Sequence, residues 1–482
     1  MDDSSSGVMG TFFQLFASVI ANLMAITDGM TMGWTAPMIP YFLSEQSHIK
    51  MTRSQAEWLE SCILIGAILG LPFTIYFVEK IGRRKSLILS TALLIICWVV
   101  IAVGDRVEYL YAARLFKGLG LNMAFVAAPM YVGEIAHKKI RGFLSSITFV
   151  MMLIGVLLIY GLGPFVPYFV PSVIAGVVLL IECVVFYFLP ESPYYLMMNN
   201  EHEAAKESLK RFRGKDANIE EELKEITETA MKERNEQIKS LKELYQVKNY
   251  RKALQIMFIL NFAQLFSSFE VIMMNLHEIL ESAGSIYMNP SIAAIIFAAI
   301  MLVSAIVAAA TMDSFGRKVL LVVSCILTGI CLLVLAIYFN VKAMGFDVEK
   351  ISWIPIASVM VYAAVFKVGL GMVPIVMTAE IFASKIKAIG MTAADGAYVL
   401  ASIIALQVYF NLKSAFGIYV PFYIFSGCAF STSIYVVFFV PETKGKSLED
   451  IQRMLRGRVD DNVEKGAEAS QETGESPKAN LG

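Results

Sequence analysis

The stretch Glu79-Lys80-Ile81-Gly82-Arg83-Arg84-Lys85 places an acid, a glycine and four cationic residues in one short segment. It lies between two apolar runs that are each long enough to cross a bilayer, so we expect a loop at the membrane surface. The stretch Asp313-Ser314-Phe315-Gly316-Arg317-Lys318 repeats the acid, the glycine and the basic pair between two later apolar runs. A charged loop of this kind that occurs twice indicates a chain built from two related halves.

The composition of the chain is that of a membrane protein. Of its 482 residues, 57% are hydrophobic and 17% are charged, and the mean hydropathy is +0.63. A soluble domain of this length carries more charge, so a soluble enzyme is excluded. The basic loops are explained by membrane topology and do not indicate nucleic-acid binding. The six cysteines and four histidines have no metal-ligand spacing, so we expect neither a metal site nor a cofactor.

Apolar segments predict an all-α integral membrane protein with twelve transmembrane helices. The first six lie at 11–33, 56–78, 87–104, 109–132, 143–163 and 167–189, and the second six at 253–276, 291–312, 319–339, 353–379, 388–412 and 420–440. We therefore divide the chain into a first six-helix bundle (1–189), a linker of amphipathic helices (190–252), a second bundle (253–456) and a polar, disordered tail (457–482).

The distribution of Lys and Arg predicts the orientation in the membrane. The loops that follow the second, fourth, eighth and tenth predicted helices hold most of the basic residues, whereas the loops on the other side hold fewer. Because basic loops stay in the cytoplasm, both termini and the linker are expected there, in a multi-pass protein of the cell membrane.

The internal repeat extends beyond the charged loop. Glu134 returns as Glu380, the basic residue Arg141 returns as Lys387, and Pro190-Glu191-Ser192 returns as Pro441-Glu442-Thr443. These landmarks keep their order and a nearly constant offset, which predicts two pseudo-symmetric halves. Two parallel repeats with a solute site between them are a transporter architecture.

The repeated acids and bases predict a network of ion pairs at the cytoplasmic ends of the helices, which we call the charge network. Single surface pairs contribute only about 0–1 kcal/mol each, but a partly buried network can hold two halves together in one state. The alternative is that the basic residues only set the topology. The network would comprise Glu79, Arg83, Arg84, Glu134, Arg141, Glu191, Asp313, Arg317, Lys318, Glu380, Lys387 and Glu442.

Several of these motifs resemble one known family. The motifs are Pro129-Met130-Tyr131-Val132-Gly133-Glu134, Arg141-Gly142, Pro190-Glu191-Ser192-Pro193 and Pro441 to Ile451. From about residue 20 to residue 457 the chain resembles the sugar porter family of the major facilitator superfamily, and within it the insect facilitated trehalose transporters. The resemblance implies the major facilitator fold and facilitated movement of a trehalose- or hexose-like sugar across the plasma membrane by alternating access.

The family's sugar-binding positions differ in this chain. Phe149 replaces a glutamine of the fifth helix, and the stretch Gln264 to Glu270 keeps only the first glutamine of the seventh-helix motif. Lys367 stands where glucose facilitators carry a glutamate, and Tyr398 replaces the asparagine of the eleventh helix. The candidate substrate-binding residues are therefore Gln264, Glu270, Lys367, Tyr398 and Phe149. Two alternatives remain, a carrier of a charged or zwitterionic metabolite and a non-transporting sugar sensor.

Charges inside predicted spans need a partner or water, because each costs at least about 2.5–3.5 kcal/mol at bilayer depth. We expect Glu270 and Lys367 to face one another, either as a two-sign binding site or as a structural ion pair. Asp28 and Arg114 resemble the acid–arginine couple of proton-linked sugar porters, which makes proton coupling a further possibility. The expected partners are a small polar solute and the lipid bilayer, with the monomer as the working unit and no nucleic acid.

Overall fold

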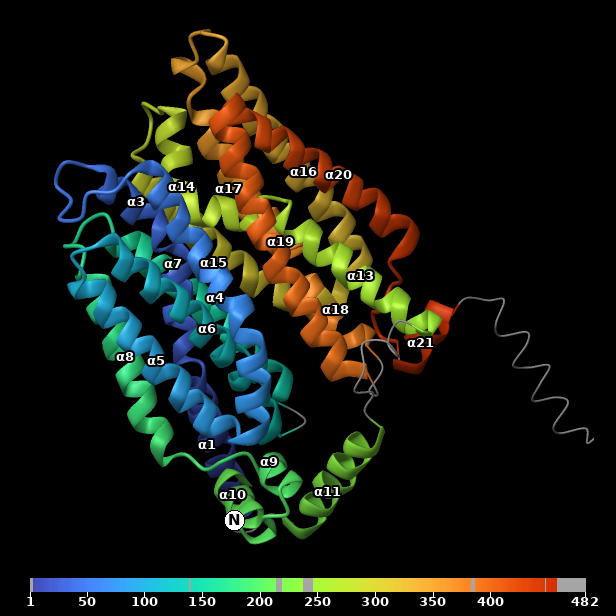
Figure 1. Cartoon of the computed structure of the whole chain (residues 1–482). Helices are drawn as coiled ribbons and strands as arrows, with labels where there is room; N and C mark the ends of the chain where they lie inside the picture. Colours follow the sequence, from blue (N-terminus) through green and yellow to red (C-terminus); the bar gives the residue numbers. More distant parts are fainter. Residues whose placement is uncertain are drawn as a thin grey trace, which may run out of the picture.

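The structure is a computed structural model that describes residues 3–137, 140–213, 219–236, 246–382, 386–446 and 448–456. All regular structure in these ranges is helical (Figure 1). The first half consists of α1 (Asp3–Ala21), α2 (Leu23–Gly33), α3 (Thr35–Leu43), α4 (Arg53–Lys80), α5 (Arg83–Val103), α6 (Val107–Ile135), α7 (Arg141–Leu162) and α8 (Val170–Phe188).

Three shorter helices follow, α9 (Pro193–Met198), α10 (His202–Arg213) and α11 (Ile219–Glu236). The second half consists of α13 (Lys248–Leu265), α14 (Phe269–Ala283), α15 (Pro290–Phe315), α16 (Arg317–Ala343), the 3-10 turn η1 (Glu349–Ile351), α17 (Trp353–Val368), α18 (Val373–Ile381), α19 (Lys387–Phe416), α20 (Tyr419–Phe439) and α21 (Leu448–Arg456).

The helices account for the twelve predicted spans. In the described part of the chain, eleven helical segments are long and apolar enough to cross a membrane, and a shorter apolar helix lies at Ile147–Leu162 within the fifth predicted span. Three spans are broken pairs of helices: α1 with α2, α13 with α14, and α17 with α18. The prediction of an all-α membrane protein with twelve spanning segments is confirmed.

Helices of each half pack mainly on one another. In the first half α4 contacts α6, α5 contacts α8 and α2 contacts α7, while in the second half α16 contacts α20 and α13 contacts α19. The halves meet where α7 packs on α15, α4 on α19 and α3 on α14 (Figure 1). The end of the molecule that carries Gly82 and Gly316 is called here the basic-loop end, and the end that carries α3 and the last turns of α14 the opposite end.

Glycines let helices of the first half approach closely. A Cβ atom at Gly66 of α4 would lie 1.9 Å from the carbonyl oxygen of Leu115, and one at Gly118 of α6 would lie 1.9 Å from that of Ile63. Backbone-to-backbone contact of this kind requires glycine on both helices, and small residues at helix crossings are typical of membrane interiors. The α4–α6 contact is therefore a rigid element of the half.

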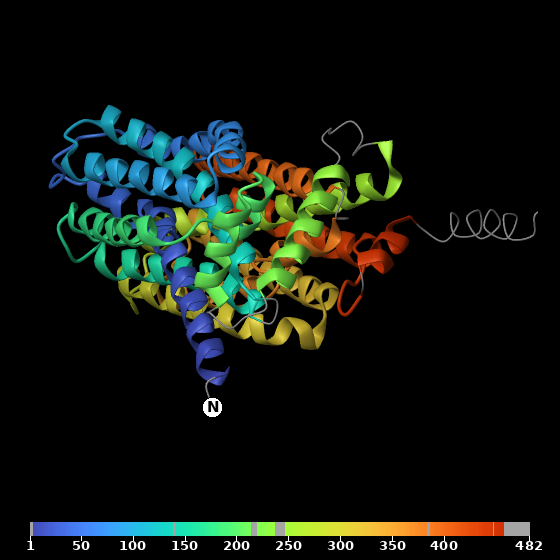
Figure 2. The same cartoon turned by 90° about the horizontal axis from the view of Figure 1, so that it is seen from below.

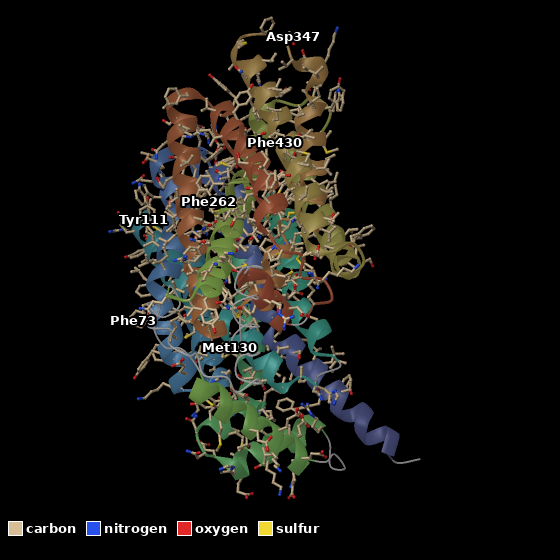
Figure 3. The ribbon with its side chains drawn as sticks, turned by 90° about the vertical axis from the view of Figure 1, so that its right-hand side faces the viewer. Phe73, Tyr111, Met130, Phe262, Asp347 and Phe430 are labelled. Carbon is tan, nitrogen blue, oxygen red and sulfur yellow. The ribbon has the colours of Figure 1, made fainter. Side chains whose placement is uncertain are left out.

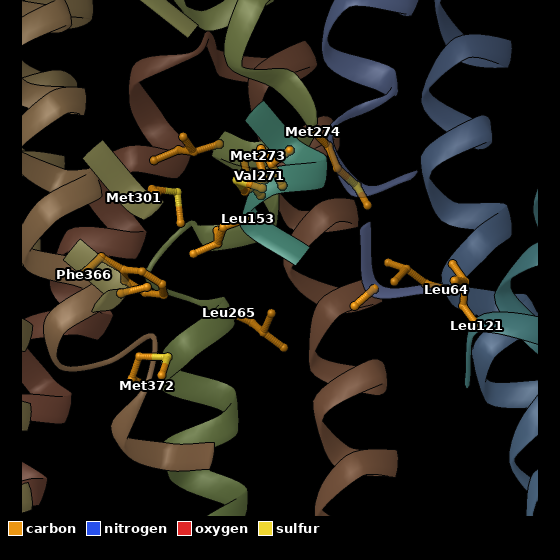
Figure 4. Packing of buried hydrophobic residues seen from close by; sticks show 14 of the residues in the cluster. Leu64, Leu121, Leu153, Leu265, Val271, Met273, Met274, Met301, Phe366 and Met372 are labelled. Carbon is orange, nitrogen blue, oxygen red and sulfur yellow. The ribbon is translucent and has the colours of Figure 1, made fainter. Parts of the chain in front are cut away.

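A continuous apolar core joins the halves. Figure 4 shows Leu153 of α7 beside Val271 and Met273 of α14, so side chains from both halves form one cluster. Large apolar side chains are also exposed on the outer surface of the bundle. Phe73 is 52% exposed and points outward (Figure 3). An apolar outer surface on spanning helices is what contact with lipid requires.

The segments at the basic-loop end are each docked on one half (Figure 2). Gln14 Nε2 of α1 donates to the Phe212 carbonyl of α10 at 2.9 Å, and Arg213 Nη1 donates to the Ile135 carbonyl of α6 at 2.7 Å. On the other half, Gln452 Nε2 of α21 donates to the Ile381 carbonyl at 2.7 Å. The linker helix α10 is thus attached to the first half, and α21 is attached to the second half.

Candidate functional site

The two basic loops have the same backbone geometry. Gly82 has φ 98° and Gly316 has φ 88°, values that favour glycine because it lacks a Cβ atom. Each glycine directly precedes a helix, α5 or α16. A Cβ at Gly82 would lie 2.5 Å from Glu191 Oε2, and a Cβ at Gly316 would lie 2.8 Å from Glu442 Oε2. Glycine is therefore needed both for the turn and for the approach of a carboxylate.

These two carboxylates bind helix N-termini. Glu191 Oε1 accepts a hydrogen bond from Arg84 N at 3.0 Å, and Glu442 Oε1 and Oε2 accept from Arg317 N and Lys318 N, each at 3.0 Å. The first amides of a helix have no acceptor within the helix, and the macrodipole favours an anion there. The carboxylates thus cap α5 and α16 from a distant part of the chain.

Backbone donors also lower the pKa of Glu442, which lies in the loop after α20. Partial burial raises the pKa of this carboxyl, but hydrogen bonds from the amides of Lys444, Lys318, Arg317 and Thr443 outweigh it, so that the net pKa is below its ordinary value. The carboxylate is therefore held in its charged form.

Each half also contains a buried ion pair of arginine and glutamate. Arg83 Nη2 lies 2.9 Å from Glu134 in the first half, and Ser192 Oγ donates to the same carboxylate. In the second half, Arg317 Nη2 lies 2.9 Å from Glu380, to which Thr443 Oγ1 donates at 2.6 Å. The repeat therefore extends to the atoms of the ion pair and its hydroxyl donor.

The charge network differs from the prediction in three respects. First, the pairs lie within one half each, so among the described residues the network does not join the halves. Second, Glu191 and Glu442 bind backbone amides and not guanidinium groups. Third, Glu79 is exposed and makes no ion pair with a described residue. The side chains of Arg141, Asp313 and Lys387 lie outside the described part of the structure.

Polar contacts between the halves lie towards the opposite end. Thr35 Oγ1 donates to the Met274 carbonyl at 3.2 Å, and Asn275 Nδ2 donates to Glu60 Oε2 at 3.0 Å. Gln407 Nε2 of α19 donates to Ser61 Oγ of α4 at 2.9 Å. Tyr160 of α7 also donates its hydroxyl to the Met273 carbonyl at 2.5 Å. Three of these hydrogen bonds join α14 to the first half and thus fix it over the end of the interface.

One carboxylate at this end binds cations from both halves. Glu278 of α14 pairs with Arg53 of α4 and, at 2.6 Å, with Lys413 Nζ of α19. A cavity of about 380 Å³ lies beside it, lined by residues of α3, α4 and α14 that include Arg53, Glu57, Asn275 and Glu281. This triad closes the interface between the halves at its rim.

The centre of the molecule contains two helix breaks that face one another. Ser268, with φ 71°, separates α13 from α14, and Gly369 to Met372 separate α17 from α18. Tyr362 of α17 donates its hydroxyl to the Ser267 carbonyl at 2.8 Å, and the rings of Phe269 and Phe366 stack at 4.9 Å. Broken helices leave backbone groups and helix ends free, which transporters use to bind solutes.

Two buried charges of opposite sign lie at these breaks. Glu270 is in the first turn of α14, and Ser402 and Tyr398 of α19 hydrogen-bond its carboxylate. Lys367 is in the last turn of α17, with Nζ 5.7 Å from the centre of the Phe269 ring. Each charge has the sign that its helix end favours. The helix ends thus explain how both charges are tolerated.

The expected ion pair between Glu270 and Lys367 is wrong. Among the described residues Lys367 makes no ion pair or hydrogen bond, and the charged neighbours of Glu270 are Asp28 and Glu60. Gln264 makes only a long contact of 3.5 Å to the Gly371 carbonyl, and Phe149 packs edge-on against Phe125 at 6.4 Å. Of the five candidates, only Glu270 and Tyr398 contact one another.

The predicted couple of Asp28 and Arg114 is also not formed. Asp28 interacts with Lys117 of α6, whose Nζ lies 2.9 Å from the centre of the Trp98 ring, while the acid that interacts with Arg114 is Glu60. Arg114 Nε donates to the Leu59 carbonyl at 2.7 Å. Glu60 and Lys117 were absent from the predicted site. Their charge within two predicted spans was the signal that could have identified them.

Two packed six-helix halves, with buried charges at central helix breaks, define a membrane transporter. Comparison with solved structures agrees on the fold. The proton:xylose symporter XylE, bound to 6-bromo-6-deoxy-D-glucose, is similar with a TM-score of 0.73 and 22% identity, over 93% of this chain and all of that chain. An inward open conformation of XylE from E. coli gives a TM-score of 0.74 at 22% identity, over 92% and 99% of the two chains. The fold is that of the major facilitator superfamily.

The family model for sugar and other transporters matches residues 13–455, so the chain belongs to that family. It is a multi-pass membrane carrier and not an enzyme. A facilitated trehalose transporter of Polypedilum vanderplanki is 28% identical, over 93% of this chain and 89% of the relative. One of Bombyx mori is 27% identical, over 92% and 86%. The chain spans only 52% of the length of a 27% identical trehalose transporter of Drosophila mojavensis.

Proposed function

We propose that the protein moves a sugar of trehalose or hexose size across the plasma membrane by alternating access, without coupling to another solute. The family assignment supports a sugar as cargo, and the trehalose transporters among the relatives support a cargo of this size. The two halves, 1–189 and 253–456, would rock against each other about the central helix breaks while the linker 190–252 and the tail 457–482 stay on the cytoplasmic side. The monomer is the working unit.

The single observation that carries the mechanism is the one-sided closure of the interface. The hydrogen bonds and ion pairs that join the halves within the described residues lie towards the opposite end, on α3, α4, α7, α14 and α19. At the basic-loop end each ion pair of the charge network stays within its own half. With basic loops and both termini in the cytoplasm, this arrangement corresponds to a state closed to the outside.

In this scheme α14 closes the outer end. The backbone is left-handed at both ends of this helix, at Ser268 and Gly284, and departs from helical geometry within it at Asn275. Met273, Met274, Asn275 and Glu278 of this helix all contact the first half. A short helix between two irregular points can tilt as a unit, so opening would exchange these contacts for water. The ion pairs of Arg83 and Arg317 would then keep each half rigid during the movement.

The test is uptake of labelled trehalose and glucose into vesicles that contain the purified full-length protein. We expect saturable uptake of at least one of the two sugars that follows its gradient and does not change when a proton gradient is imposed. Dependence on the proton gradient would contradict facilitated transport. Binding of sugar without any uptake would instead indicate the sensor function.

A further inference from the structure

We propose that Lys367 makes the site at the two central helix breaks selective for a sugar acid, that is, a polyol or sugar ring that carries one carboxylate. The proposal rests on the carrier function above and narrows its cargo. This lysine is buried, has no acidic partner among the residues that the structure describes, and lies beside an aromatic ring.

Lys367 is a buried cation that has no counter-charge within the described part of the chain. Its side chain is 2% exposed, and the described residues give it neither an ion pair nor a hydrogen bond. An ammonium group removed from water is costly unless another group compensates it. The end of α17 and the face of Phe269 supply part of that compensation, since both attract a cation. Neither supplies the oxygen acceptors that its three donors need.

The carboxylate of Glu270 does not compensate Lys367 because it has other partners. Ser402 and Tyr398 of α19 bind it, and the first turn of α14 favours its charge. Glu270 can still accept hydrogen bonds from hydroxyl groups, because a carboxylate has about four acceptor sites. Glu270 is therefore bound by its partners on α19, whereas Lys367 has no acidic partner among the described residues.

The surroundings of Lys367 suit a sugar ring. The rings of Tyr362 and Phe366 are fully buried and stack in series with that of Phe269, with ring centres 5.3 Å and 4.9 Å apart, so Phe269, which is partly exposed, is the ring that can offer a face beside the lysine. Aromatic faces bind the apolar face of a sugar ring, while the ammonium group can donate to a carboxylate on the ring in a charge-assisted hydrogen bond. A neutral sugar leaves Lys367 without an acceptor of opposite charge, whereas a sugar acid provides one.

The experiment compares D-glucuronate with D-glucose, which differ by oxidation at one carbon, as inhibitors of labelled-sugar uptake into vesicles containing the full-length protein. We expect the inhibition constant of glucuronate to be at least about tenfold lower than that of glucose, because glucuronate gains one charge-assisted hydrogen bond. The advantage should be lost in Lys367→Met and largely kept in Lys367→Arg. The control Lys210→Met, on the exposed face of α10, should behave as the wild type.

The melting midpoint of each purified variant, with and without glucuronate, gives a readout that does not need transport. A shift by glucuronate in the wild type but not in Lys367→Met supports the proposal. Equal inhibition by glucose and glucuronate in the wild type overturns it, and that arm needs no variant to fold. Stronger inhibition by a zwitterion such as glycine than by glucuronate also overturns it. If the vesicles take up none of these sugars, and none of them inhibits uptake of a labelled sugar, the carrier function itself is contradicted.

Discussion

Asn275 of the second half donates its side-chain amide to Glu60 of the first half, with Nδ2 3.0 Å from Oε2. Both side chains are buried, and Asn275 is also the point at which the backbone of α14 leaves helical geometry. The bond therefore connects a glutamate within the α4 span to the helix that covers the opposite end. Any movement that opens this end must break it.

Replacement of Asn275 by leucine should favour opening of this end. Asn275→Leu removes the donor and leaves the buried carboxyl of Glu60 without this partner, which costs about 1–3 kcal/mol in the closed state. The measurement is the rate at which a membrane-impermeant maleimide labels Ala56→Cys, in a background without the native cysteines, since Ala56 lines the cavity at this end. We expect faster labelling than with Asn275 intact. Glu60→Gln, which keeps an oxygen acceptor, is the control and should change the rate far less.

Removal of the charge on Glu278 should weaken the same closure. Glu278→Gln leaves Arg53 and Lys413 without their shared carboxylate. Loss of one charge-assisted contact costs about 1.5–3 kcal/mol, so we expect the maleimide to label Ala56→Cys at least about tenfold faster. Glu281→Gln provides the control, because Glu281 lines the cavity without an ion pair among the described residues. An identical labelling rate in the two variants would show that the triad does not hold the end closed.

The ion pair of Arg83 and Glu134 should contribute to stability and not to closure. Glu134→Ala leaves a buried arginine without its partner, which costs about 3–5 kcal/mol. We expect a lower melting midpoint in detergent, and the same for Glu380→Ala in the second half. Glu79→Ala should stay within about 0.5 kcal/mol of the wild type, since that residue is exposed. The joint change Arg83→Leu with Glu134→Leu should recover part of the loss.

Glycine at position 82 should be irreplaceable. Gly82→Ala puts a Cβ atom 2.5 Å from Glu191 Oε2 on a backbone with φ 98°, and such conformations cost a non-glycine residue about 1–3 kcal/mol. The melting midpoint and the yield of folded protein should both fall. For comparison, a Cβ at Gly176 of α8 would contact nothing within 4 Å, so Gly176→Ala should be neutral or stabilising by up to about 1 kcal/mol.

The carboxylate of Glu442 should make the stability of the folded protein depend on pH. Its pKa is lower in the folded protein than in the unfolded chain because backbone amides bind the charged form. Its contribution is therefore complete above the ordinary pKa of glutamate, about 4.3, and is lost as the pH falls through the folded value. The difference in melting midpoint between wild type and Glu442→Gln should be largest at pH 7 and shrink below pH 4. A constant difference would contradict this mechanism.

The repeated motifs predicted more of the basic-loop end than of the centre. Gly82 and Gly316 could be expected at a turn, and Glu134 and Glu380 near arginines, because short loops confine these residues to one membrane surface. The same motifs did not show that Glu191 and Glu442 bind backbone amides. That role depends on where α5 and α16 begin relative to a distant loop, which no local sequence signal specifies.

The central residues were identified by type but not by partner. Glu270 and Lys367 stand out as charges within apolar spans, but which groups they contact depends on the rotation of α14 and α17 about their axes and on the breaks at Ser268 and Gly369. A rotation of one residue, about 100°, moves a side chain to another face. Lys117 and Glu60 show the same limit, since each is visible as a charge but acquires its neighbours only when helices pack.

The sequence by itself determined the twelve spans, the repeat of the two halves and the family, because bilayer thickness and loop charge act on local segments of the chain. The tertiary structure alone decided which end of the interface is closed and that no acid of the described residues pairs with Lys367. These features depend on contacts between residues more than 200 positions apart, such as Glu60 with Asn275, and only packing of the whole chain brings such residues together.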